Sequence, residues 1–251
     1  MKINIKEIKD YLNSKKYQYK IFKIQYTELE KKSISEFSID KNDNFNYYGN
    51  YKNMHGLNNF LQSVGSNSIT NINKLEQIIN KMIMNITKAY QLEYYILNVR
   101  ITLPTTEFDL VRWHKDVYGG ESSKFVFIMK GPGTLFLKAT NEVNNIYFKI
   151  WNKQIEERRA KNMTFKEQIE QDEKYKIVYA QALKNFKVKQ INNNEGVIFY
   201  AGDKKQNING ALHSEPKMDI NRIFISIMPH TKEYIEAQNK FEEKINNQIK
   251  K

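Results

Sequence analysis

The sequence contains no cysteine and very little glycine or proline. Its 251 residues include 10 Gly and 4 Pro. Without cysteine the chain cannot form disulfides, zinc–thiolate sites, iron–sulfur clusters or thiol nucleophiles. The scarcity of Gly and Pro argues against long disordered linkers. The chain is long enough for one sizeable domain, or for one domain with an insertion.

Long apolar runs are also missing. No segment approaches the roughly 18 apolar residues that a membrane span requires. The N-terminal residues MKINIKEIKDYLNSKK carry a charge every few positions, so they lack the apolar core of a signal peptide. We expect an intracellular, cytoplasmic protein with no membrane partner.

The chain is basic, with a formal net charge of +12 at pH 7. One interpretation is a nucleic-acid or other acidic partner. The other is base composition, because Lys, Asn, Ile and Tyr all have AT-rich codons and are abundant here. The lysines are spread along the chain rather than gathered in one block, which favours the second interpretation.

Hydrophobic periodicity divides the N-terminal part from the rest of the chain. Residues 1–92 predict an N-terminal layer of helices and irregular segments with one strand, which supports the core. Some of its apolar positions recur at helical spacing, and the others show no regular spacing. The expected elements are a helix at 3–12, a strand at 19–26, and loops over 33–70 with a short helix near 57–63. An amphipathic helix follows, with apolar positions from Leu75 to Tyr90 at helical spacing and Thr70 or Asn71 as its cap.

Period-two patterns then predict a mainly β core in two halves, 93–140 and 187–229. A helical insertion at 141–186 separates the halves, and a C-terminal helix occupies 230–251. A sheet built from two halves fits a jelly roll, or double-stranded β-helix, within one domain spanning 1–251. The expected strands are 94–103, 110–118, 124–130, 133–138, 187–191, 196–201 and 222–228.

One predicted strand carries two metal-ligating side chains, in the segment VRWHKDV. Residues two apart in a strand point to the same face, so His114 and Asp116 lie side by side. An imidazole and a carboxylate in this arrangement offer two neighbouring ligands for a divalent transition metal.

The second half of the core supplies a third candidate ligand, His213, which follows the strand at 196–201 and a polar loop. If the two halves face each other, His213 joins His114 and Asp116. Two histidines and one carboxylate form the facial triad of non-haem Fe(II) oxygenases. The positions left open can accept a bidentate 2-oxo acid and then O2.

Arg222 stands at the start of an otherwise apolar strand, nine residues after His213. A charged group in this setting needs a partner. Its planar fork matches a carboxylate, such as the distal carboxylate of 2-oxoglutarate. Ser226 shares the strand face of Arg222 and can add a hydrogen bond in the same region.

Taken together, these motifs resemble the Fe(II)/2-oxoglutarate-dependent dioxygenase superfamily over about 94–229. The similarity comprises His-x-Asp, a distal His about one hundred residues later, a Gly-Val-Ile-Phe strand, His-Ser-x-Pro and the trailing Arg. The resemblance implies a double-stranded β-helix. It also implies oxidative decarboxylation of 2-oxoglutarate to succinate and CO2, coupled to hydroxylation by O2. The implied iron ligands are His114, Asp116 and His213, and the implied cosubstrate anchor is Arg222.

Some positions depart from related patterns. Phe224 stands where some subfamilies have Ser, and no second Arg follows Arg222 on its strand, unlike in DNA-repair members related to AlkB. The prime substrate is therefore expected to be a protein or peptide side chain or a small molecule, with nucleic acid still open. Lys124 is an alternative cosubstrate anchor, and Arg100 either lines the barrel or sits in water at an edge.

Two other functional classes remain open at this point. The chain could be a catalytically inactive, basic β-barrel binding module, with nucleic acid as one possible ligand. It could also be a cupin-type metal enzyme that does not use 2-oxoglutarate. The insertion at 141–186 fits either a lid over the site or an ordinary solvated cover of the barrel.

Overall fold

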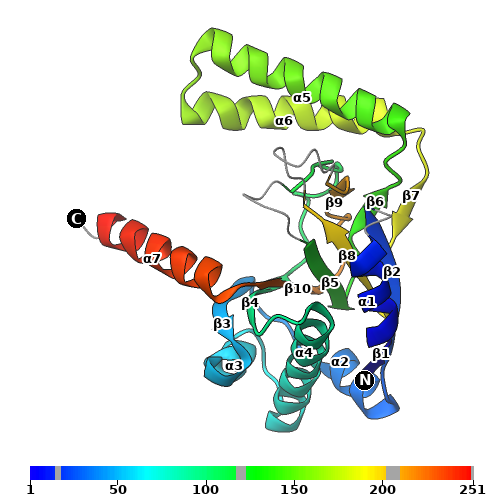
Figure 1. Ribbon diagram of the computed structural model, residues 1–251, viewed down its shortest axis with the longest axis vertical. Helices are drawn as coiled ribbons and strands as arrows, with labels where there is room; N and C mark the ends of the chain where they lie inside the picture. Colours follow the sequence, from blue (N-terminus) through cyan, green and yellow to red (C-terminus); the bar gives the residue numbers. More distant parts are fainter. Residues whose placement is uncertain (15–17, 117–122, 202–209, 250–251) are drawn as a thin grey trace.

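The computed structural model describes residues 1–14, 18–116, 123–201 and 210–249. Within these residues the strands form two antiparallel sheets (Figure 1). The larger sheet has the order β1-β2-β8-β5-β10-β4-β3 and the smaller has the order β7-β6-β9. The strands are β1 (Lys2–Ile3), β2 (Tyr19–Gln25), β3 (Asp43–Asn50), β4 (Tyr94–Thr102), β5 (Ser123–Lys130), β6 (Leu135–Leu137), β7 (Val188–Gln190), β8 (Glu195–Tyr200), β9 (His213–Ser214) and β10 (Arg222–His230).

The connectivity is that of a double-stranded β-helix. From β4 the chain crosses to the small sheet at His114, returns to β5, and crosses again to β6. After the insertion it runs through β7, β8, β9 and β10, again passing between the two sheets. The predicted jelly-roll core is therefore confirmed. The side chains between the sheets include Val126, Phe136, Phe199, Ala211 and Phe224.

A second and larger core lies on the other face of the large sheet. Alternate residues of β10 turn toward it, among them Ile223, Ile225 and Ile227. The longest helix on this face, α4 (Ile69–Tyr90), buries the apolar stripe that its sequence predicted. Its cap is Ser68 rather than the expected Thr70 or Asn71, because the side chain of Ser68 accepts the backbone N–H of Asn71, and the helix therefore begins two or three residues earlier than predicted. The other helices on this N-terminal side are α1 (Ile5–Ser14), α2 (Glu28–Glu36) and α3 (Leu57–Ser63), with a 3-10 turn η1 (Tyr51–Asn53).

Within 33–70 the predicted short helix near 57–63 is confirmed as α3, but the loops predicted around it were wrong at two places. Helix α2 runs into this range and is held by a capping box between Thr27 and Glu30. Strand β3 pairs with β4 over its whole length, at the edge of the large sheet. Its sequence DNFNYYGN is polar because an edge strand needs only one buried side, and Phe45 and Tyr47 are the residues that pack on the core.

The insertion forms a helical hairpin, α5 (Asn141–Lys161) and α6 (Phe165–Leu183), which stands beyond the small sheet (Figure 1). Arg158 and Asp172 form an ion pair between its helices at 2.5 Å. Its aromatic inner side packs on Trp113 and Leu212, each of which directly precedes a predicted metal ligand. The hairpin therefore braces both segments that carry the histidines.

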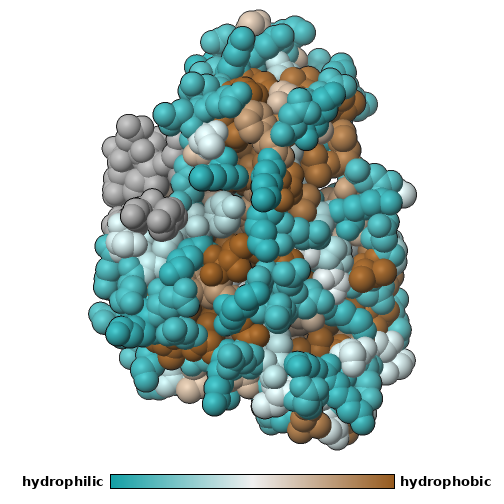
Figure 2. Space-filling model, turned by 90° about the vertical axis from the view of Figure 1, so that its right-hand side faces the viewer, coloured by the Kyte–Doolittle hydropathy of each residue, from teal (hydrophilic) through white to brown (hydrophobic). Residues whose placement is uncertain are grey.

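The outer surface of the hairpin is partly apolar. Phe165 is 79% exposed, and several other large apolar side chains of α5 and α6 are also solvent-accessible. In Figure 2 brown side chains gather in the upper part of the molecule, where this hairpin lies, while hydrophilic residues cover much of the remaining face. The C-terminal helix α7 (Lys232–Ile249) extends from the edge of the sheet near β3 (Figure 1). Among the described helices, none combines the length and apolarity needed to cross a membrane.

The core beneath the large sheet provides a test of stability. Ile83 of α4 is completely buried, whereas the adjacent Met84 is 54% exposed. We expect Ile83→Ala to lower the free energy of unfolding by about 2–5 kcal/mol, because it leaves a cavity in a packed core. Met84→Ala should change it by roughly 0.5 kcal/mol or less. Urea denaturation followed by circular dichroism measures both values, and equal losses would mean that α4 does not bury this face.

Candidate metal centre

Backbone pairing brings the two predicted histidine ligands together. His114 and His213 lie directly opposite each other in an antiparallel bridge between the two halves of the barrel. The N–H of His114 donates to the carbonyl of His213 at 2.9 Å, and the N–H of His213 donates back at 3.0 Å. This is a hydrogen-bonded antiparallel pair, which places both side chains on one face of the small sheet.

Both imidazoles are oriented in the same way by the backbone. The Nδ1 atom of His114 lies 2.9 Å from the carbonyl oxygen of Arg112, and the Nδ1 atom of His213 lies 3.0 Å from that of Ala211. A carbonyl can only accept, so each Nδ1 carries a proton and Nε2 is the nitrogen of each ring that can offer a lone pair to a metal. This arrangement is typical of histidines that bind a metal through Nε2.

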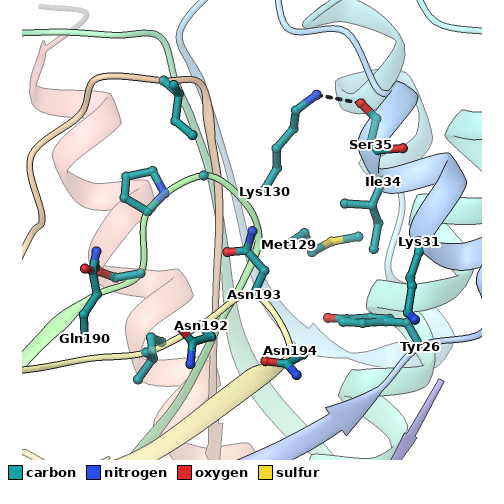
Figure 3. A pocket seen from close by; sticks show the side chains of 15 residues that line it. Tyr26, Lys31, Ile34, Ser35, Met129, Lys130, Gln190, Asn192, Asn193 and Asn194 are labelled. Atoms are coloured by element: carbon teal, nitrogen blue, oxygen red, sulfur yellow. Dashed lines mark hydrogen bonds between the residues drawn. The ribbon is translucent and has the colours of Figure 1, made fainter.

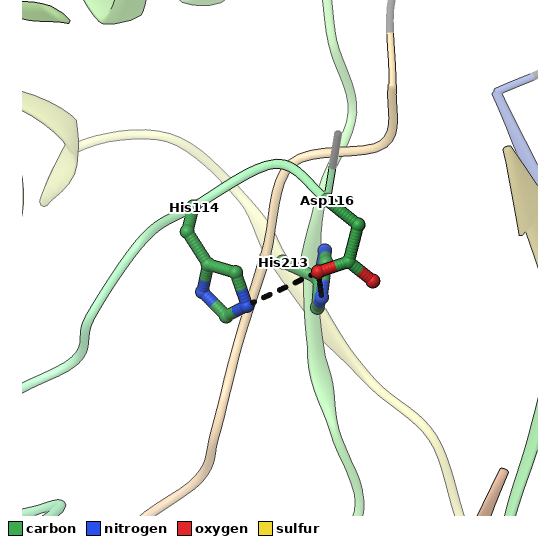
Figure 4. A group of neighbouring side chains, drawn as sticks. All are labelled: His114, Asp116 and His213. Carbon is green, nitrogen blue, oxygen red and sulfur yellow. Dashed lines mark ion pairs between the residues drawn. The ribbon is translucent and has the colours of Figure 1, made fainter. Parts of the chain in front are cut away.

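Asp116 completes the cluster (Figure 4). Its Oδ1 atom lies 3.8 Å from Nε2 of His114 and 3.7 Å from Nε2 of His213. One ligand atom from each residue falls within 4.8 Å of the others. Donors bound to a single ion at about 2.1 Å stand roughly 3 Å apart at a right angle, so a small adjustment would close the set around an ion.

The protonation states suit a cation. Burial lowers the pKa of His213 to about 4, so its ring is neutral near pH 7. Burial alone would raise the pKa of the Asp116 carboxyl, but the neighbouring His213 and Lys124 hold it at about 2. Lys124 contacts the outer oxygen of this carboxylate at 2.6 Å. Two imidazoles and one carboxylate fit a divalent transition ion, and this donor set is typical of non-haem Fe(II).

A cavity of about 420 Å³ opens on the cluster between the two sheets. Basic side chains reach it from three elements, namely Arg100 from β4, Arg112 from the segment before His114, and Lys124 from β5. Such a lining favours an anionic ligand. The remaining lining residues are Glu107, Phe108, His114, Asp116, Val126, Thr134, Phe199, His213, Glu215 and Phe224.

Arg222, the predicted cosubstrate anchor, is 2% exposed and is already paired. Its Nη1 atom donates to Oε2 of Glu215, and its Nη2 atom donates to Thr134 Oγ1 at 3.0 Å. Arg100 donates to the other oxygen of Glu215 at 2.7 Å. Burial alone would raise the pKa of Glu215, but the two guanidinium groups lower it to about 2, so it is ionised.

The structure therefore brings some of the predicted side chains to the cavity and leaves others behind it. The three candidate ligands and Lys124 line the cavity, whereas Arg222 lies behind Glu215. Ser226 is buried farther along β10, in register with Val126, and among the described lining residues β10 is represented by Phe224. Both cosubstrate assignments, Arg222 and Ser226, stay predictions.

Sequence reasoning missed Glu215. A signal was present, because Glu215 follows His213 by two residues and so shares its face in an extended segment. The same alternation was applied to His114 and Asp116 but not here. The polar loop at 202–209, which precedes this segment, lies outside the described residues.

A second, more open cavity of about 800 Å³ lies elsewhere on the molecule, between α2 and the turns that follow β5 and β7 (Figure 3). Its walls carry carboxamides, including Gln190 and Asn192, and among the described lining residues there is no histidine or acidic side chain. The amine of Lys130 points away to the backbone carbonyls of Ser35 and Phe37.

Metal binding can be tested on the ligands directly. His114→Ala should abolish tight binding of one Fe(II) per chain, because a 2-His-1-carboxylate site loses a third of its protein donors. His55→Ala is the matched control, since His55 is exposed and lies outside the cluster. Anaerobic isothermal titration calorimetry measures both. Equal Fe(II) affinity in wild type and His114→Ala would show that the ion binds elsewhere.

Comparison with known proteins finds relatives only among solved structures. No family model matches the chain, and no curated protein matches its sequence. A prolyl-4-hydroxylase from Pseudomonas putida aligns over 91% of this chain and 100% of its own, with 7% identity and a TM-score of 0.44. A Kdo hydroxylase, a non-haem Fe(II) α-ketoglutarate-dependent dioxygenase, aligns over 89% and 84%, with 12% identity and a TM-score of 0.46.

A third match is a dioxygenase for auxin oxidation from Arabidopsis thaliana in complex with 2-oxoglutarate. It covers 90% of this chain and 87% of its own, with 8% identity and a TM-score of 0.39. These three structures share at most 12% of their residues with this chain. The resemblance to Fe(II)/2-oxoglutarate dioxygenases in the sequence motifs is thus accompanied by a double-stranded β-helix and a clustered His-Asp-His set.

Proposed function

We propose that this protein is an Fe(II)- and 2-oxoglutarate-dependent oxygenase that hydroxylates its substrate. The observation that carries this assignment is the orientation of His114 and His213. Both rings are held at Nδ1 by backbone carbonyls, and both Nε2 atoms face one oxygen of Asp116. Two histidines on a solvated surface would not be expected to share this orientation.

His114, Asp116 and His213 would hold the iron, and the positions left open would take the 2-oxo acid and O2. Bound iron supplies the redox chemistry that joins O2 reduction to decarboxylation of 2-oxoglutarate. Lys124 holds the Asp116 carboxylate by its outer oxygen, which leaves the inner oxygen directed at the histidines. The bracing of Trp113 and Leu212 by the hairpin keeps both ligand segments in place.

The cosubstrate would occupy the basic cavity beside the cluster. Its oxo-acid end belongs at the open metal positions, and its distal carboxylate needs a cation within the cavity or at its wall. Arg222 is the first candidate, because Thr134 fixes one arm of its fork on the cavity side. Lys124 is the second candidate, from the neighbouring strand β5.

The prime substrate we propose is a protein or peptide side chain or a small molecule. A further cavity of about 90 Å³ adjoins His114 and is lined by hairpin residues that include Tyr147, Trp151 and Tyr179. A small aromatic recess next to the iron suits a compact group that must be placed within reach of the oxidant. The insertion then serves as a wall of the substrate site.

A metal-dependent barrel enzyme that does not use 2-oxoglutarate is the second candidate. The pairing of Arg222 with Glu215 favours it, because an internal carboxylate already occupies the cation that a cosubstrate would bind. Both candidates predict Fe(II) binding at the same three residues. They differ in whether 2-oxoglutarate coordinates the bound iron.

The discriminating experiment adds Fe(II) and then 2-oxoglutarate to the protein without oxygen. We expect the visible iron-to-ketoacid charge-transfer band in wild type and no band in His114→Ala. Arg222→Lys keeps the charge but loses the fork, so half-saturation should need about tenfold more 2-oxoglutarate. Arg159→Lys, an exposed change on the hairpin, is the control and should match wild type.

Admission of O2 then completes the test. Wild type should convert 2-oxoglutarate to succinate, and His114→Ala should not. If folded wild type supplied with Fe(II) gives neither a band nor succinate, the use of 2-oxoglutarate is refuted. Fe(II) bound at the three residues would then favour the metal enzyme without 2-oxoglutarate, and no bound Fe(II) would favour the binding module.

A further inference from the structure

Glu215 forms a closed cluster with two arginines from different strands of the large sheet. Arg222 of β10 and Arg100 of β4 each contact a different oxygen of its carboxylate. Both guanidinium groups also lie against the ring of Phe224, with centroid distances of 4.9 Å for Arg222 and 4.4 Å for Arg100. Glu215 is therefore gripped from both sides rather than directed into solvent.

The charges in this cluster do not balance. Two guanidinium groups face one carboxylate, which leaves one positive charge, and the side chains of Arg222 and Glu215 are only 2% and 16% exposed. The Nε–H groups of both arginines are buried without an acceptor among the described residues. Two buried donors without an acceptor are costly unless something completes them. One further carboxylate would balance the charge and supply an acceptor.

The cluster lies at the wall of the metal cavity. Glu215 and Arg100 both line it, and Glu215 follows the metal ligand His213 by two residues. Arg222 lies immediately behind Glu215 and is anchored to Thr134, which also lines the cavity. A ligand that reaches from the metal toward Arg222 therefore meets the carboxylate of Glu215 first.

We propose that Glu215 is a built-in competitor for the cosubstrate's distal carboxylate. In the ligand-free protein it occupies Arg222. When 2-oxoglutarate binds, the distal carboxylate takes the place of Glu215 on Arg222, and Glu215 stays on Arg100. This exchange presupposes the proposed use of 2-oxoglutarate. It makes Glu215 the residue that sets the affinity for a 2-oxo acid with a distal carboxylate.

Arg222 is suited to bind the incoming carboxylate, and Arg100 is suited to retain Glu215. Arg222 is held by Thr134 as well as by Glu215, so its fork stays in position when one partner leaves. The Arg100 side chain is 38% exposed and is therefore freer to follow Glu215 as it moves. After the exchange, two carboxylates would face two guanidinium groups, and the excess charge would be gone.

Anaerobic isothermal titration calorimetry of 2-oxoglutarate into the Fe(II)-loaded protein tests the exchange. Glu215→Gln keeps the shape but removes the competing charge, so the Kd should fall about tenfold. Arg100→Ala removes the group that retains Glu215, so the Kd should rise. Glu107→Gln removes a different carboxylate from the same cavity and measures the general electrostatic effect, which should stay below about threefold. Circular dichroism and Fe(II) stoichiometry establish that each variant is folded.

A second ligand isolates the distal carboxylate. 2-Oxobutyrate has the same oxo-acid end but no distal carboxylate, so Glu215→Gln should leave its Kd unchanged. The inference is overturned if Glu215→Gln binds 2-oxoglutarate as wild type does or more weakly, which would make Glu215 a structural clamp for the arginines. If neither wild type nor Glu215→Gln binds either acid, the proposed function itself has failed. Binding of 2-oxoglutarate by Glu215→Gln alone would show that the glutamate blocks the site.

Discussion

The reciprocal backbone hydrogen bonds between His114 and His213 are the contact on which the functional site depends. They join two segments about one hundred residues apart and set both imidazoles on one face. The carbonyls of Arg112 and Ala211 then fix the tautomer of each ring. The donor geometry is therefore built by the main chain, which side-chain substitutions elsewhere disturb little. Asp116 only has to follow His114 by two residues to complete the set.

Around this pairing, each layer of the fold has a distinct task. The large sheet, backed by α4, provides the rigid floor from which Arg100, Lys124 and Arg222 project. The hairpin of α5 and α6 packs on the residues that precede the two histidines and so restrains them from outside. The result is a basic cavity that contains the His-Asp-His cluster. At the cavity wall, two arginines share a single carboxylate.

Much of this arrangement could be predicted from the sequence, because apolar residues recur at strand or helix spacing along most of the chain. Alternation predicted most of the core strands, and helical spacing predicted α4. The predicted strand at 110–118 was wrong for its described residues, 110–116, which form only an isolated bridge at His114, although His114 and Asp116 do lie together. Strand β3 was missed because an edge strand with mostly polar residues has little alternation to detect. The partner of Arg222 was missed for a different reason. A buried cation predicts that some anion is present, but only the folded chain shows that Glu215 supplies it.

We propose that one iron ion binds at the convergence of the two Nε2 atoms and the Asp116 carboxylate. Anaerobic crystals grown with Fe(II) and measured at the iron absorption edge test this most directly. We expect a single strong anomalous peak within bonding distance of His114 Nε2, His213 Nε2 and Asp116 Oδ1. A peak located elsewhere, or no peak in crystals in which the three side chains are well ordered, would contradict it.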